Sequence, residues 1–73
     1  MAVRKRSLSI RGHMTSVSLE DAFFVELRRI ADERALSLAG LIAEIDAGRA
    51  RTTNLSSALR LYVLEDLKAR IVA

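Results

Sequence analysis

Few side chains of this 73-residue chain are suited to chemistry, and most of those are cationic. Four positive charges come first, and no acidic residue precedes Glu20. They belong to Arg4, Lys5, Arg6 and Arg11. Of the 12 lysines and arginines, eight remain after these four, against nine acids, so the formal net charge of +3 comes from the first dozen residues. A basic segment on a near-neutral body predicts a polyanionic partner, with nucleic acid ahead of an anionic membrane.

Residues for catalysis or metal binding are scarce. The chain has no cysteine, and its single histidine, His13, has no second ligand of its kind for a metal. The acid pairs Glu20-Asp21 and Glu65-Asp66 fall in predicted helices, where adjacent side chains point apart. We therefore predict no enzyme, no cofactor, no metal site and no small-molecule ligand, and we interpret His13 as a turn residue beside Gly12.

The elements that position these residues follow from the hydropathy pattern. Residues 7–19 alternate between apolar and polar side chains, which is typical of a half-buried strand. Gly12 interrupts the alternation and is compatible with a bend, a bulge or a turn between two short strands. We predict one short strand over about 14–19. Residues 1–6 show no periodicity and are predicted to form a basic arm ahead of a single domain over 7–73.

Three helices are predicted after the strand, over about 21–34, 38–46 and 55–71, from apolar residues at three- and four-residue spacing. Ser37 is the expected N-cap of the second helix. Gly40 costs that helix about 1 kcal/mol relative to alanine, so a close approach is expected to favour it there. The fold class is mostly α with one short β-strand (α+β).

The size of the chain predicts a homodimer. A domain this small buries only about 60% of its unfolded surface, and without cysteines it has no disulfides to compensate. A lone strand must also pair its backbone groups. We therefore predict an intermolecular antiparallel two-stranded ribbon on a twofold axis. The predicted dimer core comprises apolar residues of the strand and the first two helices: Val17, Leu19, Phe23, Leu27, Leu41, Ile42 and Ile45.

Apolar residues of the third helix extend beyond one stripe, through Leu61, Leu64 and Ile71, so this helix is predicted to be covered on two sides. No apolar run approaches the roughly 20 residues of a membrane span. The basic N-terminus is not followed by the apolar region of a signal peptide. A cytoplasmic protein is expected.

The layout of residues 15–45, TSVSLEDAFFVELRRIADERALSLAGLIAEI, resembles that of ribbon-helix-helix (Arc/MetJ-like) proteins, a class of bacterial regulators. The segments KRSLSIRGHMTSVSLE and NLSSALRLYVLEDL are similar to a subfamily with an added C-terminal helix. The resemblance covers roughly residues 5–67. It implies a ribbon-helix-helix homodimer whose ribbon enters the major groove of double-stranded DNA, with dimers that assemble further on the DNA.

The resemblance also implies the site. Strand residues Met14, Ser16 and Ser18 would contact bases, and the start of the second helix at Ser37 or Leu38 would contact a phosphate. The cationic residues Arg4, Lys5, Arg6 and Arg11 would contact phosphates.

Three residues depart from the family pattern: Met14 replaces an arginine, Ala35 a glycine and Ala39 a polar residue. Ala35 is therefore expected in a costly left-handed conformation.

The sequence is compatible with two functions. The first is a sequence-specific DNA-binding transcriptional regulator that acts as a homodimer, a bacterial repressor that is associated with the nucleoid when bound to DNA. The alternative is a protein–protein interaction module, an antitoxin-like or adaptor dimer that uses the third helix as its docking surface. The motive for the alternative is the weak hydrogen-bonding chemistry of Met14, Ser16 and Ser18 beside a broadly apolar third helix, but the regulator is the function that we predict.

Overall fold

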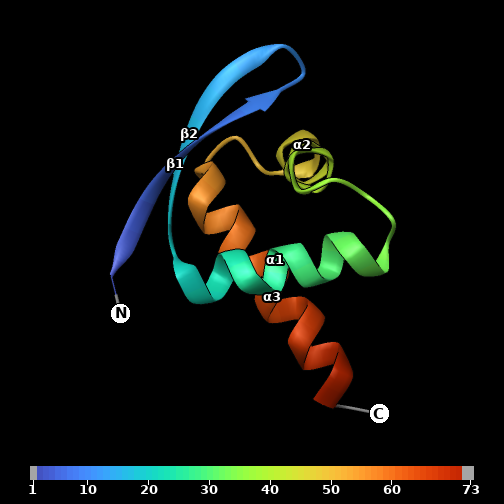
Figure 1. Ribbon diagram of the computed structural model, residues 1–73. Coiled ribbons are helices and arrows are strands. Elements are labelled where there is room, and N and C mark those ends of the chain that lie inside the picture. The colour runs from blue at the N-terminus through green and yellow to red at the C-terminus, as the bar shows by residue number, and fades with distance from the viewer. Residues whose placement is uncertain (1, 72–73) are drawn as a thin grey trace.

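The computed structural model describes residues 2–71 and has two strands followed by three helices. Strand β1 (Val3–Ile10) and strand β2 (His13–Glu20) form an antiparallel hairpin. Helices α1 (Asp21–Glu33), α2 (Leu38–Gly48) and α3 (Leu55–Ile71) pack against one face of the hairpin. In Figure 1 the C-terminal half of α3 extends away from the hairpin.

The hairpin corrects two predictions. The chain has two strands rather than one, and residues 3–6, assigned to a basic arm, belong to β1. Of the three interpretations of Gly12, the turn between two strands is the one found. Arg11 and Gly12 form a two-residue loop with φ of 51° and 80°, and positive φ at both loop residues matches the twist of paired strands. The alternation in the first half of β1 is hidden in the sequence because Arg4 and Arg6 take positions that face the helices, whereas Leu8 and Ile10 take them in the second half.

The ribbon is also formed within one chain, whereas an intermolecular ribbon was predicted. β1 supplies the pairing that β2 was expected to find in a second copy. The other edge of β2 is contacted by α3 at Ser18: its backbone N–H donates to Ser56 Oγ at 3.2 Å, and its carbonyl accepts from Arg60 Nη2 at 3.3 Å. A second chain cannot pair with β2 at Ser18 while α3 holds both backbone groups.

The helix boundaries follow local signals. Ser37 Oγ accepts the Gly40 N–H at 2.9 Å, which confirms the predicted N-cap, and Asn54 Oδ1 accepts the Ser57 N–H at 2.8 Å at the start of α3. A Cβ atom at residue 40 would lie 3.0 Å from Ser37 Oγ, so the cap itself explains the glycine. Ala35 has φ of 56° between α1 and α2, as expected for a residue that replaces glycine.

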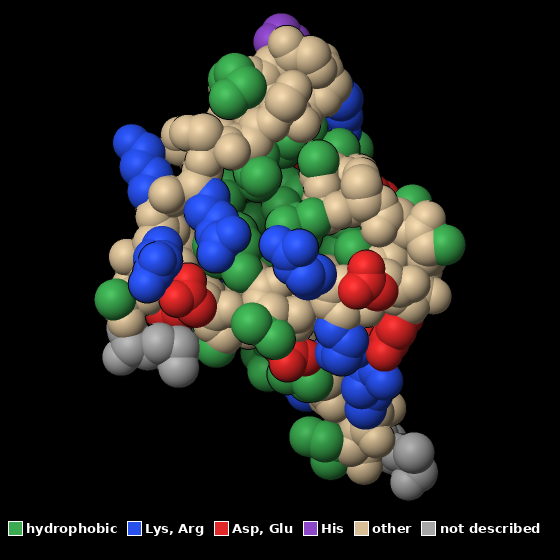
Figure 2. Space-filling view, in the orientation of Figure 1, with side chains coloured by type: hydrophobic (Ala, Val, Ile, Leu, Met, Phe, Trp, Pro, Cys, Tyr) green, Lys and Arg blue, Asp and Glu red, His purple; other side chains and the backbone are tan. Residues whose placement is uncertain are grey.

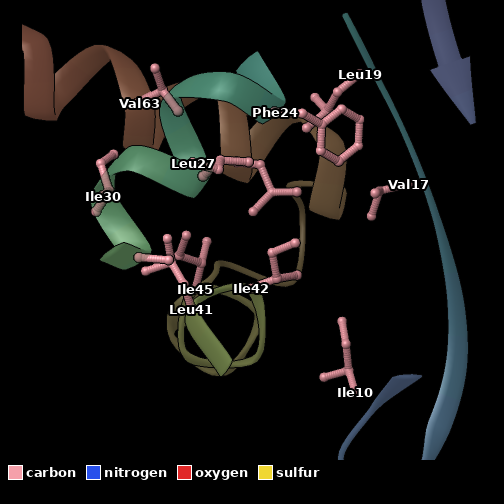
Figure 3. Close-up of a cluster of buried hydrophobic side chains, with 12 residues drawn as sticks. Ile10, Val17, Leu19, Phe24, Leu27, Ile30, Leu41, Ile42, Ile45 and Val63 are labelled. Atoms are coloured by element: carbon pink, nitrogen blue, oxygen red, sulfur yellow. The ribbon is translucent and has the colours of Figure 1, made fainter. Parts of the chain in front are cut away.

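The hydrophobic core lies between the inner side of the hairpin and all three helices (Figure 3). Six of the seven residues predicted as dimer core are buried within the single chain, and Phe23 is half-buried. The premise that these side chains need a second chain is therefore wrong, and pairing of two chains stays a prediction. The remaining buried side chains are Ile10, Phe24, Ile30, Ala31, Leu59 and Val63.

Candidate nucleic-acid interface

The register of the hairpin separates its side chains into two faces. Because directly opposed residues share a face, the pairs Arg4–Leu19 and Arg6–Val17 lie toward the helices, with Leu8–Thr15 beyond them. We call this the inner face. The outer face is formed by the pairs Lys5–Ser18, Ser7–Ser16 and Ser9–Met14.

The outer face contains all three residues predicted to contact bases, and all three are exposed. Met14 has 72% of its surface exposed. The pairing adds Lys5, Ser7 and Ser9, which were not predicted as base-contacting residues. The sequence signal that could have found Ser7 and Ser9 is their alternation with Leu8 and Ile10. In the structure every second position of residues 3–10 is exposed, and the others turn progressively inward. The outer face thus presents five side chains with hydrogen-bonding groups, a serine hydroxyl or an ammonium, plus one methionine.

Two of the predicted phosphate-contacting cations belong instead to the inner face. Arg4 Nε lies 3.1 Å from Asp21 Oδ2, and Arg6 Nη2 lies 3.8 Å from Asp21 Oδ1. The guanidinium of Arg6 also lies over the ring of Phe24, 4.4 Å from its centroid. These contacts attach β1 to the start of α1, so part of the charge counted for the basic arm is engaged within the chain.

The hairpin tip is held to α2 by Arg11, whose Nη2 donates to the Ala43 carbonyl at 2.8 Å. Arg11 therefore has a structural contact in addition to its predicted role toward phosphate. The histidine at the tip, visible at the top of Figure 2, is His13, which is exposed and begins β2. Its position directly after the two-residue loop agrees with the interpretation as a turn residue.

The N-terminus of α2 offers free backbone donors. Ser37 caps the Gly40 amide, but the amides of Leu38 and Ala39, in the first turn, have no intrahelical carbonyl to bind. No acid lies in this turn, so the positive end of the helix dipole is not compensated there. The backbone chemistry at Ser37 and Leu38 is compatible with the predicted phosphate contact.

The charge on the hairpin is mainly positive. Cationic side chains gather along the hairpin in Figure 2, whereas cations and acids alternate where α1 meets α3. At the end of β2, the outer face ends at Glu20, and Glu20 Oε1 lies 3.2 Å from Arg60 Nε. A backbone hydrogen bond at Glu20, followed by the Arg60 side chain, lowers the pKa of this carboxyl. Glu20 is thus a paired anion at the edge of the outer face.

Other kinds of site are not found in the described part of the chain. Within residues 2–71 no cluster of three or more histidine, cysteine or acidic side chains could hold a metal ion. None of the helices over this range combines the length and apolar character that crossing a bilayer requires.

The family model for the ribbon-helix-helix domain matches residues 3–67, so the chain belongs to the ribbon-helix-helix family. Proteins of this family are generally DNA-binding transcription regulators or antitoxins, and their domains are typically non-enzymatic. They typically dimerise. No curated protein and no solved structure matches the chain.

Proposed function

We propose that this protein is a sequence-specific DNA-binding transcriptional regulator that acts as a homodimer in the cytoplasm of a bacterium, where it represses genes. The observation that carries the proposal is the outer face of the hairpin, where Lys5 and four serines lie in two exposed rows. A two-stranded ribbon is one of the elements that the major groove of B-DNA admits. The family to which the chain belongs supports the same function.

Lys5 gives the outer face a long hydrogen-bond donor. Met14 occupies a position where the family pattern has an arginine, but Lys5 lies on the same face opposite Ser18, four residue pairs along the ladder from the pair Ser9–Met14. A lysine ammonium can donate to guanine O6 or N7, and serine hydroxyls can bind several bases, while Met14 is suited to a thymine methyl group. In this proposal Lys5 and the methionine provide discrimination, and the serines add less selective contacts.

Phosphate contacts position the ribbon in the groove. The amides at the start of α2, at Ser37 and Leu38, bind one phosphate in this proposal. Arg4, Arg6 and Arg11 remain candidates for others, because a guanidinium engaged at one edge retains further donors. Their intrachain contacts mean that each gives less affinity than a free cation would.

The experiment measures binding of fluorescently labelled DNA from the protein's own promoter region, and of a scrambled duplex, at several salt concentrations. Lys5→Ala is compared with Arg4→Ala, its neighbour on the inner face. We expect Lys5→Ala to weaken binding to the preferred duplex by about tenfold or more, and Arg4→Ala to weaken it less. Equal affinity for both duplexes in the wild-type protein, or a larger loss in Arg4→Ala than in Lys5→Ala, would contradict the proposal.

The second candidate function, a protein–protein interaction module, is favoured by one observation. Helix α3 exposes Leu61, Leu64 and Ile71, and exposed apolar surface of this kind is typical of an interaction site. A stoichiometric protein partner recovered with the wild-type chain but not with a Leu64→Glu variant, in the absence of DNA affinity, would favour this function over the first.

A further inference from the structure

Helix α3 differs between its two ends. Its first half packs into the core through Leu59 and Val63, which are buried. Its second half extends away from the hairpin (Figure 1), and a row of exposed apolar side chains runs along the helix from Leu61 to its C-terminal end. We call this row the α3 stripe; it consists of Leu61, Leu64, Leu67 and Ile71, exposed by 54%, 48%, 37% and 80%. Their three- and four-residue spacing puts them on one side of the helix over about 15 Å.

A groove continues the α3 stripe at its N-terminal end. A cavity of about 420 Å³ lies between α2 and α3, lined in part by Ile45, Ala50, Ala58 and Tyr62. Leu61 and Glu65 belong to both the groove and the exposed side of α3. The stripe and the groove therefore form one continuous apolar surface with an open end beside Leu61.

Ionic contacts hold the opposite side of α3 against α1. Arg29 Nη2 lies 2.7 Å from Asp66 Oδ2, and Arg70 bridges Asp66 and Glu33. The Arg29 guanidinium lowers the pKa of the Asp66 carboxyl. These contacts fix the rotation of the helix, so that the α3 stripe points away from the rest of the chain.

We propose that the α3 stripe pairs with the α3 stripe of a second copy of this chain, antiparallel about a twofold axis near Asp66. An axis at this level places Leu61 of one copy opposite Ile71 of the other. The groove beside Leu61 then receives Ile71 of the second copy, the most exposed side chain of the stripe.

The charges beside the stripe favour a second copy over an unrelated partner. Glu65 and Lys68 border it, both largely exposed, and the 3.7 Å between them leaves their pairing weak. In the antiparallel arrangement, Glu65 of one copy comes within one residue's rise, about 1.5 Å along the axis, of the level of Lys68 of the other. The symmetry repeats this opposite-charge contact on both sides of the axis, so the surface complements itself.

This pairing does not depend on DNA binding, because none of its residues lies on the outer face of the hairpin. It also leaves the hairpin intact, since β2 remains paired with β1 and with α3 at Ser18. Two hairpins would thereby belong to one assembly without exchanging strands.

The experiment is sedimentation velocity over a range of micromolar concentrations on the full chain. We expect the wild-type protein to associate, and Leu64→Glu to shift to the smaller species with a dissociation constant raised about tenfold or more. Val25→Glu, an equally radical change at a residue 62% exposed on α1, serves as the matched control and should associate like the wild type. Circular dichroism confirms that each variant is folded.

A second test distinguishes self-pairing from other occupants. Glu65→Lys and Lys68→Glu should each weaken association, because each opposes like charges across the axis. Mixing these two variants should restore it, since every contact across the axis is then between a cation and an acid. A wild-type monomer at all concentrations would overturn the proposal, as would unchanged association of Leu64→Glu. Failure of the mixture to recover, or saturation of the stripe by a different protein, would equally overturn it.

Discussion

The two faces of the hairpin show how three adjacent cations acquire different surroundings. Arg4 and Arg6 face the helices and contact Asp21 and Phe24, whereas Lys5 between them faces outward beside Ser18. The difference arises because successive side chains of a strand point to opposite sides. A basic run therefore does not act as one charged patch once it is part of a strand. Its alternate members, Arg4 and Arg6, contact helix α1, and Lys5 between them remains exposed.

The largest expected contrast between the faces is in stability. Leu19 is fully buried on the inner face, so Leu19→Ala should lower the free energy of unfolding by about 2–5 kcal/mol. Its neighbour Ser18 is exposed on the outer face, and Ser18→Ala, which keeps the backbone bonds to α3, should change it by no more than about 0.5 kcal/mol. Urea denaturation of both variants checks this. A loss in Ser18→Ala similar to that in Leu19→Ala would mean that the faces are not distinct.

A smaller contrast is expected between the cations. Arg6→Ala removes the contact with the Phe24 ring and should lower the free energy of unfolding by about 0.5–1 kcal/mol. Lys5→Ala should leave stability nearly unchanged, although it is expected to weaken DNA binding. The two variants are compared by thermal unfolding and by DNA titration. If Lys5→Ala is the more destabilising of the pair, β1 does not have the orientation described.

The smallest expected effect concerns Glu20, at the end of the outer row. Its pKa is lowered from the ordinary value of 4.5 in the folded protein, so its contribution to stability is present above that pH. The contribution is lost as the pH falls through the folded pKa, because the unfolded chain then binds the proton more readily. Glu20→Gln should therefore destabilise the protein near pH 7, and its effect should shrink progressively as the pH falls below 4.5. Urea midpoints of both proteins across this range provide the measurement, and a difference that persists at low pH would exclude the mechanism.

The helices could be predicted closely because their signals are local. The first was expected over 21–34 and spans Asp21–Glu33; the third has the predicted bounds. The cap at Ser37 is also as predicted. The helices and this cap depend on interactions between residues only a few positions apart, which the order of residue types reveals directly. The left-handed backbone at Ala35 agrees as well, but it was expected from the family resemblance rather than from local pattern.

The candidate site was predicted only in part. Met14, Ser16 and Ser18 are exposed together as expected, but the role of β1 was missed, because Arg4 and Arg6 concealed its inner side. The phosphate contacts expected of Arg4, Arg6 and Arg11 stay predictions, and all three residues have partners within the chain that no local pattern shows.

Local sequence pattern alone predicted the three helices, the burial of Val17 and Leu19, and the exposed row of side chains on β2. It could do so because the periodicity of apolar residues shows which side of an element is buried. The strand that pairs with β2 was decided at both of its edges. On one edge the two-residue Arg11–Gly12 loop reverses the chain and brings β1 alongside, and on the other Ser56 and Arg60 of α3, distant in sequence, contact Ser18. A strand's backbone groups accept any suitable partner, so the choice between its own chain and a second one depends on the loop that precedes the strand and on the helix at its other edge, not on the residues of β2 itself.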